Sequence, residues 1–385
     1  MRADAVTAPR YGQASLADVL PSALAALGVP DSPDPLGLGT RLDGVRRIAV
    51  VLVDGLGYHL LGRAAPVSPT IADVLAGRLG TLTELTTCFP STTPTSLVSL
   101  GTGVPPGAHG ILGFFLNVPG TDRVLNHIDW FTDPDPAVWQ PVPTQFDRAV
   151  AAGVSVSVAS RPEYAGSGLT TAAYRGAPYR RAADIGELAA QILTGLADTP
   201  SLSYGYHPTL DHAGHVFGLE SAQWLAAVTE VDALLTRLVD GLPPDAALLV
   251  TADHGQLDIP PDHRVDLDAD LRLSDGIRVV AGEPRVRYLH TEAGAAADVI
   301  EAWHAVLGDR AWVASREEVV DTGWYGPVPP DHLDRLGDVI VTCRGRYAIL
   351  ATKREKDSIA KMIAMHGGNT IEEMAIPLVL VRGGG

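Results

Sequence analysis

Acidic and imidazole side chains follow two apolar runs of this sequence in motifs that are typical of metal sites. Asp54 comes directly after the run 47–53, and Asp253 and His254 come shortly after the run 246–251. A buried strand that ends in an acid places a carboxylate at the carboxyl edge of a sheet, where α/β proteins hold their ligands. We therefore expect these three side chains to meet at one sheet edge.

Three further side chains complete the set of candidate ligands. Asp211 and His215 are four residues apart, so one turn of helix brings both to the same face. His366 lies in a Gly-rich turn before the apolar run 376–381. Carboxylates together with imidazoles suit a divalent metal, zinc above all. Three carboxylates and three imidazoles are about the inventory that two metal ions ~4 Å apart require.

A hydroxyl group that could attack phosphorus comes from the segment 89–103. Proline is favoured at the first helical position, so Pro94 predicts Thr93 as the N-cap of a helix. The unpaired N–H groups and the positive dipole end there suit a phosphate and its nucleophile. With one ion lowering the nucleophile's pKa and another stabilising the leaving oxygen, the set suits in-line displacement at phosphorus.

Each motif also has an ordinary structural explanation when it is taken alone. Asp54 could cap the next helix, and Thr93-Pro94 is a common helix start. His212 is expected to point away from the other ligands in a structural role, and His109 to cap a turn. The combination of motifs, rather than any one of them, carries the prediction.

The elements that must position these residues follow from the hydrophobic pattern. Near-continuous apolar runs predict strands of a sheet that is covered on both faces. The runs are 47–53, 154–159, 246–251 and 376–381. Helical spacing is clearest in 183–197 and 221–242. The alternation predicts an α/β fold whose central, mostly parallel sheet is flanked by helices.

Three parts of the chain differ in pattern. Residues 1–40 predict an N-terminal helical extension with a short helix at 16–27. Residues 257–361 predict a smaller α+β insertion, in which short strand-like pieces surround a helical run. Residues 41–256 plus 362–385 then form the catalytic α/β core.

Composition excludes several classes of protein. The chain has 385 residues, 46% of them hydrophobic, which is enough to bury a core. Acidic residues exceed basic ones by 45 to 29, which argues against a nucleic acid polymer as partner. No apolar stretch approaches the ~20 residues that span a bilayer, and the N-terminus does not resemble a secretory signal. These features predict a cytoplasmic protein without a membrane partner or a disulfide framework, and they leave its oligomeric state open.

The order of the motifs resembles the alkaline phosphatase superfamily, and within it the type I phosphodiesterase/nucleotide pyrophosphatase family. Asp-Gly, a helix-start Thr, Asp-x-x-x-His, Asp-His-Gly and a late His-Gly-Gly occur in order between about residues 48 and 381. The segment 89–93, followed by Gly-Thr-Gly at 101–103 and His-Gly-Ile at 109–111, is similar to the family's nucleophile segment.

The resemblance implies a hydrolase of phosphoric esters with two divalent metal ions, zinc or, alternatively, manganese. The ligands of the first ion would be Asp211, His215 and His366. The ligands of the second would be Asp54, Asp253, His254 and the Thr93 hydroxyl. Thr93 would attack phosphorus and form a phosphothreonine intermediate, which water would hydrolyse.

One departure from the family concerns an Asn that its phosphodiesterases place a few residues after His-Gly-Ile to hold a phosphoryl oxygen. The matching place here is Gly113-Phe114, so Asn126 or Asn117 would have to substitute for it. Tyr206 and His207 are candidates for the lining of a substrate pocket. The insertion stands where superfamily members carry a substrate-selecting lid, and its Arg285, Arg287, Arg344 and Arg346 could contact a phosphate-bearing substrate or lie at the surface.

The predicted function is therefore a phosphodiesterase or nucleotide pyrophosphatase that acts on a small phosphorylated substrate. A phosphomonoesterase or a phosphonoacetate-hydrolase-like enzyme could use the same site. A catalytically silent binding protein with this fold is the alternative from another class.

Overall fold

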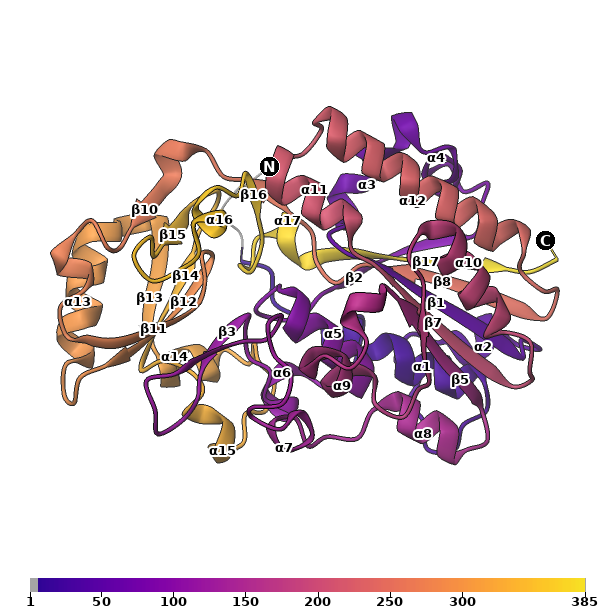
Figure 1. Cartoon of the computed structure of the whole chain (residues 1–385), viewed down its shortest axis with the longest axis horizontal. Coiled ribbons are helices and arrows are strands. Elements are labelled where there is room, and N and C mark those ends of the chain that lie inside the picture. The colour runs from indigo at the N-terminus through magenta and orange to yellow at the C-terminus, as the bar shows by residue number, and fades with distance from the viewer. Residues whose placement is uncertain (1–5, 385) are drawn as a thin grey trace.

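The computed structural model describes residues 6–384, so the first five residues of the predicted extension and Gly385 lie outside the described residues. A large lobe and a smaller lobe lie side by side, each built on its own sheet (Figure 1). No helix within residues 6–384 is long and apolar enough to cross a membrane.

Within the described residues, a seven-stranded sheet forms the centre of the large lobe, in the order β2-β17-β8-β1-β7-β5-β6. Its strands are β1 (Arg47–Val53), β2 (Thr81–Thr86), β5 (Ser155–Ser160), β6 (Tyr179–Arg181), β7 (Ser201–His207), β8 (Ala246–Thr251) and β17 (Ala375–Arg382). Strand β17 runs antiparallel to both of its neighbours, whereas β1, β5, β6, β7 and β8 pair in parallel. The predicted mostly parallel sheet is therefore confirmed.

Strand β7 is central to the sheet, yet no apolar run predicted it. Its sequence alternates Ser, Leu and Tyr and contains Gly205, but all of its residues are buried. The polar side chains find partners inside the lobe: Ser203 Oγ lies 3.2 Å from Ser157 Oγ, and the hydroxyls of Tyr204 and Tyr174 are 3.1 Å apart. Because hydrogen bonding removes the cost of burying polar groups, a polar sequence can form a core strand.

Helices cover both faces of the large sheet (Figure 1). The longer ones are α1 (Val19–Ala26), α4 (Pro69–Leu75), α5 (Thr93–Thr102), α8 (Gln145–Ala151), α9 (Gly168–Tyr174), α10 (Ile185–Thr194), α11 (Thr209–Phe217) and α12 (Ala222–Asp240). The shorter ones are α2 (Leu38–Arg41), α3 (Leu61–Ala64), α6 (Pro106–His109), α7 (Pro136–Trp139) and α17 (Ile371–Met374). Helices α4, α10 and α11 pack against α12, and α1, α8 and α9 pack against α5.

The smaller lobe is built from elements that lie between Ile277 and Ala360. Its sheet has the antiparallel order β11-β12-β14-β13. The elements are β11 (Ile277–Glu283), β12 (Val286–Thr291), α13 (Ala296–Leu307), β13 (Ala311–Ser315), α14 (Arg316–Asp321), α15 (Pro330–Leu333), β14 (Val339–Cys343) and α16 (Asp357–Ala360).

Short pairs of strands lie outside the two larger sheets. They join β3 (Phe115–Asn117) to β4 (Val124–Asn126), β9 (Leu257–Asp258) to β16 (Ala364–Met365), and β10 (Arg264–Asp266) to β15 (Ala348–Leu350). Trp303 belongs to an apolar cluster of the smaller lobe that is separate from the main core of the protein.

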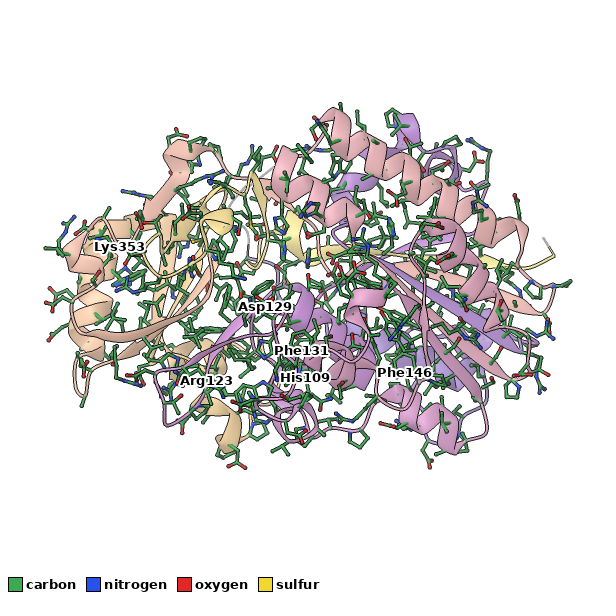
Figure 2. The ribbon with its side chains drawn as sticks, viewed as in Figure 1. His109, Arg123, Asp129, Phe131, Phe146 and Lys353 are labelled. Carbon is green, nitrogen blue, oxygen red and sulfur yellow. The ribbon has the colours of Figure 1, made fainter. Side chains whose placement is uncertain are left out.

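Ion pairs hold the two lobes together. Arg285 of the smaller lobe pairs with Glu373 at the end of α17 (Nε–Oε1 2.8 Å), and both side chains are fully buried. Within the smaller lobe, Arg287 is buried against Glu355, so neither arginine is a surface group or free for a substrate. At the surface, Lys356 Nζ lies 2.8 Å from Asp129 Oδ2, and Figure 2 places Asp129 beside the junction of the lobes.

Candidate active site

The loops after β1 and β8 bring three predicted ligands together. His254 Nε2 lies 3.6 Å from Asp54 Oδ1 and 3.2 Å from Asp253 Oδ2, and all three side chains are buried. Gly55 has φ 75°, a conformation that favours glycine, and its N–H donates to Asp253 Oδ1 (3.0 Å). We call Asp54, Asp253 and His254 the Asp54 cluster.

A second group, the Asp211 cluster, comprises Asp211, His215 and His366. Helix α11 places Asp211 Oδ2 3.1 Å from His215 Nε2, as the spacing predicts. His366 comes from the turn after β16, and its Nε2 lies 3.7 Å from Asp211 Oδ1 and 3.2 Å from His215 Nε2. The rings of His366 and His254 stack with their centroids 3.5 Å apart, so the two clusters adjoin.

The atoms left without partners fit metal ions. Asp54 Oδ1 and Asp253 Oδ2 are buried and have no hydrogen-bond partner. Nδ1 of His215 donates to the Ala364 carbonyl (2.8 Å) and Nδ1 of His366 to the Ser91 carbonyl (2.8 Å), which leaves both Nε2 atoms free to bind metal. Cations would satisfy these facing lone pairs.

Two sets of three residues could each hold a metal ion, because within each set the candidate ligand atoms lie within 4.8 Å of one another. The first set is Asp54, Asp253 and His254, and the second is Asp211, His254 and His366. His254 therefore lies within reach of both candidate metal positions, whereas the resemblance implies it as a ligand of only one. His215 lies against the second set through Asp211 and His366.

Thr93 stands at the first position of α5, with Thr92 as the N-cap (φ −131°, ψ 147°). The prediction of Thr93 as the N-cap was wrong by one residue, because Pro94 occupies the second helical position instead of the first. Thr93 Oγ1 lies 3.2 Å from His254 Nε2. The hydroxyl therefore faces the Asp54 cluster at the start of a helix.

Burial and mutual repulsion shift the pKa values of the ligands. Burial, followed by repulsion from Asp211, raises the pKa of Asp253 to about 6. Burial raises the pKa of Asp54 well above its ordinary value, and Asp253 adds to the shift. Burial lowers the pKa of His254 to about 4 and that of His366 to about 3. Both imidazoles are therefore neutral near pH 7, as metal ligands must be.

Asp211 and His215 shift each other. Burial favours a higher pKa for Asp211, but His215 and then His366 hold it below its ordinary value. Burial favours a lower pKa for His215, but Asp211 raises it. Each of the two groups therefore favours the charged form of the other.

Metal affinity is expected to rise steeply between pH 5 and pH 7. The raised pKa of Asp253, about 6, means that the metal-free fold binds this proton more tightly than the unfolded chain. Its contribution to stability is complete below the unfolded pKa of ~3.9 and is lost as the pH rises through about 6. A metal ion competes with that proton. Competition with a chromophoric chelator at pH 5, 6 and 7 measures the affinity, and equal affinities would contradict the assignment of Asp253 as a ligand.

Tyr206, a predicted substrate-binding residue, contacts the predicted ligand Asp54. Its hydroxyl donates to Asp54 Oδ2, and its ring borders a cavity of about 120 Å³. That cavity also adjoins Thr93, Phe131 and Tyr164, so Tyr206 borders a possible substrate space as well.

The Tyr206→Phe variant is expected to weaken metal binding by roughly 10- to 100-fold, because a partner that orients a ligand is lost. Activity at saturating metal should stay within a few-fold of the wild type. The measurement is the metal concentration that gives half-maximal activity. An unchanged half-saturation point with a raised KM would show that Tyr206 serves the substrate alone.

Among the described residues, the side chains of the other predicted substrate residues make no hydrogen bond to either cluster, although the His207 carbonyl accepts the Asp54 N–H (3.0 Å). His207 faces Glu230 (Nε2–Oε1 3.8 Å), and burial lowers the pKa of His207 to about 4. The Asn117 amide donates to the carbonyls of Thr121 and Arg123 inside the β3–β4 hairpin. Asn126 Nδ2 donates to Asp129 Oδ2 (3.2 Å). Within residues 6–384, neither asparagine contacts a predicted ligand.

The two histidines that the sequence analysis set apart also lie outside the clusters. His109 Nδ1 accepts the Ile111 N–H (3.1 Å) and Nε2 bonds to Ser99 Oγ (2.8 Å), which is a turn-stabilising role. His212 is exposed on α11. Its predicted orientation away from the ligands therefore agrees with the structure.

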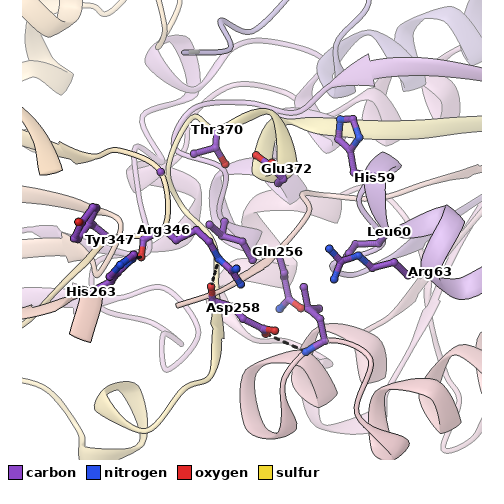
Figure 3. A pocket seen from close by; sticks show the side chains of 13 residues that line it. His59, Leu60, Arg63, Gln256, Asp258, His263, Arg346, Tyr347, Thr370 and Glu372 are labelled. Carbon is purple, nitrogen blue, oxygen red and sulfur yellow. Dashed lines mark hydrogen bonds between the residues drawn. The ribbon is translucent and has the colours of Figure 1, made fainter. Parts of the chain in front are cut away.

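Gln256 is a positioning residue that sequence reasoning missed. Its Nε2 donates to the carboxylate of Asp211 and to the Asp211 carbonyl. Gln256 also borders a pocket of about 400 Å³ between the lobes, in which Arg346 Nε donates to the Asp258 carbonyl (2.6 Å; Figure 3). Its place two residues after His254 was the available signal.

An α/β sheet with acid–imidazole clusters at the carboxyl ends of its strands, beside a helix-start threonine, defines the class of hydrolases related to alkaline phosphatase. More specifically, a model of the type I phosphodiesterase / nucleotide pyrophosphatase family matches residues 48–369, and the chain belongs to this family. It is therefore a hydrolase of that type, as the motif order predicts.

Solved structures share this fold. Murine ectonucleotide pyrophosphatase/phosphodiesterase 5 is 20% identical, with a TM-score of 0.70 over 87% of this chain and 88% of that chain. An inactive threonine-to-alanine variant of the murine protein in complex with AMP is 19% identical, and the human protein is 18% identical; each has a TM-score of 0.68 over 88% of both chains. No curated protein matches the chain.

Proposed function

We propose that the chain hydrolyses nucleotide-type phosphodiesters with Thr93 as the nucleophile and two metal ions. The observation that carries the proposal is the position of Thr93 Oγ1, 3.2 Å from His254 Nε2 at the edge of the Asp54 cluster. Asp54 Oδ1 and Asp253 Oδ2 lie in that cluster without partners. A hydroxyl placed there would lie next to a metal ion held by the Asp54 cluster, and the charge of that ion would activate it.

The two clusters would hold the two ions. Asp211, His215 and His366 would bind one, and Asp54, Asp253, His254 and Thr93 the other. Mixed nitrogen and oxygen ligands favour zinc, and manganese is the alternative. When bound, the ions lower the pKa of the Thr93 hydroxyl and neutralise charge on the reacting phosphate.

The residues of the chain then carry out two displacements. Thr93 Oγ attacks phosphorus, the Oγ–P bond forms, and the bond from phosphorus to the leaving oxygen breaks. Water next attacks the phosphothreonine, and the P–Oγ bond breaks to restore Thr93. The N–H groups at the start of α5 face the transferred phosphate and stabilise its negative charge.

A nucleotide is the substrate class that the surroundings of Thr93 favour. The cavity beside Thr93 is mainly apolar and aromatic, with Leu97, Phe131, Tyr164 and Tyr206 on its walls. Aromatic walls suit a planar base, and the inactive relative binds AMP. We further propose that the lobe of residues 257–361 is a substrate-selecting lid on a cytoplasmic enzyme.

A phosphomonoesterase is the second candidate, because one observation favours it. The position of the family's phosphoryl-binding amide is held by Gly113-Phe114, and the Phe114 N–H donates to Glu283 Oε2 (2.9 Å). A phosphonoacetate-hydrolase-like activity would use the same site.

Hydrolysis of bis-p-nitrophenyl phosphate beside p-nitrophenyl phosphate tests the proposal, with zinc or manganese supplied. A diester preference supports the phosphodiesterase. A monoester preference favours the second candidate. Turnover of neither ester, together with retained nucleotide binding, would indicate a catalytically silent binding protein.

A further inference from the structure

Glu283 is a buried carboxyl group with one oxygen unsatisfied. It ends β11 in the smaller lobe and is 4% exposed. Its Oε2 accepts the Phe114 N–H (2.9 Å), whereas Oε1 has no hydrogen-bond partner. Leaving a buried carboxyl oxygen without a partner is costly, so a bound group that satisfies it would gain affinity.

The space that Glu283 adjoins borders the Asp211 cluster. A cavity of about 50 Å³ is lined by Glu283, Phe114, Thr92, His215 and His366, among others. The cavity beside Thr93 and Tyr206 shares no lining residue with it. Two different cavities therefore adjoin the site, one at Thr93 and one at the Asp211 cluster.

The direction of attack assigns these cavities to different parts of the substrate. In an in-line displacement the leaving oxygen departs on the side opposite the nucleophile. Thr93 stands at the Asp54 cluster, so the leaving group departs toward the Asp211 cluster. Two ligands of that cluster, His215 and His366, line the cavity of Glu283.

We propose that Glu283 donates a hydrogen bond to the leaving group of the bound ester and favours esters with poor leaving groups. This inference rests on the proposed function. In that cavity the unpartnered Glu283 Oε1 would meet the leaving oxygen. The contact stabilises charge that develops as the bond from phosphorus breaks.

The protonation state of Glu283 agrees with a donor role. Burial raises the pKa of Glu283 to about 8, partly offset by the Phe114 N–H and by Arg287, while Glu355 and Glu373 raise it further. The carboxyl group therefore carries its proton near pH 7.

Two esters with the same reacting phosphate but different leaving groups test the proposal. Methyl p-nitrophenyl phosphate has a good leaving group and methyl phenyl phosphate a poor one. Glu283→Ala is expected to lower kcat/KM for the phenyl ester by roughly 10- to 100-fold, and for the p-nitrophenyl ester by about fivefold or less. Glu283→Gln should keep most of the activity on both esters. Its amide oxygen can accept the Phe114 N–H, and its amide nitrogen can donate a hydrogen bond to the leaving group.

Controls separate this role from a structural one. Glu355→Gln alters a carboxylate that pairs with Arg287 in the same lobe and should affect both esters equally. Metal content and unfolding temperature show whether each variant is folded. If Glu283→Ala does not fold, Glu283→Gln decides: preserved activity on the phenyl ester supports donation, and a selective loss on that ester refutes it.

The outcomes distinguish this inference from the proposed function. Equal losses on the two esters in Glu283→Ala, or no loss, would overturn the role of Glu283 while the wild type still depends on Thr93. A wild type that turns over neither ester, or one whose activity survives Thr93→Ala, would overturn the proposed function itself and this inference with it.

Discussion

Replacing Thr93 with alanine is expected to lower kcat by roughly 10³-fold or more, because the proposed nucleophile is removed. Metal content should stay near that of the wild type, since the acids and imidazoles remain. Thr93→Ser should keep much of the activity because it retains the hydroxyl. Steady-state kinetics with bis-p-nitrophenyl phosphate measures both variants.

Thr95→Ala is the matched control for this experiment. Thr95 lies on the same helix and is also buried, and its Oγ1 has no hydrogen-bond partner. Its loss should leave kcat within a few-fold of the wild type. If Thr93→Ala and Thr95→Ala had equal effects, the role of Thr93 would be structural.

Asp253→Asn is expected to reduce activity by at least roughly 100-fold and to stabilise the metal-free protein. The asparagine Oδ1 can still accept the N–H groups of Gly55 and His254, which now bond to Asp253 Oδ1. The substitution removes a buried negative charge close to Asp54 and Asp211. Relief of that repulsion should raise the unfolding temperature of the metal-free protein above pH 7, by roughly 1 °C per kcal/mol relieved.

The same variant should lose most of the stabilisation that metal gives the wild type, because a ligand that binds only the folded state stabilises it in proportion to its affinity. Calorimetry with and without zinc, at equal protein concentration, measures both changes. If metal-free Asp253→Asn unfolded below the metal-free wild type, the repulsion inferred among these carboxylates would be wrong.

The predictable part of the fold was the part encoded in short apolar runs. The run 47–53 matches β1, and 246–251 matches β8. Strand β7 was not predicted, because its buried polar groups form hydrogen bonds with residues distant in the sequence, such as Ser157 and Tyr174. A short sequence pattern does not show which distant residues will form these hydrogen bonds.

The two acid–imidazole clusters could be predicted because each residue lies in a short motif whose position relative to a strand or helix is fixed. Asp211 and His215 meet through helix geometry alone. Glu283 could not be found in this way, since it comes from another lobe and approaches Phe114 only through folding. The contact between Tyr206 and Asp54 likewise depends on the register of β7 with β1, which the sequence does not state.

Trapping the covalent intermediate tests the central claim most directly. Mixing the metal-loaded enzyme with bis-p-nitrophenyl phosphate, quenching in acid within the first turnover and mapping peptides by mass spectrometry locates any bound phosphoryl group. We predict a phosphoester on Thr93 in the wild type and none in Thr93→Ala. A modification at another residue, or a wild type that turns over with no trapped adduct and a single displacement at phosphorus that inverts its configuration, would contradict the account.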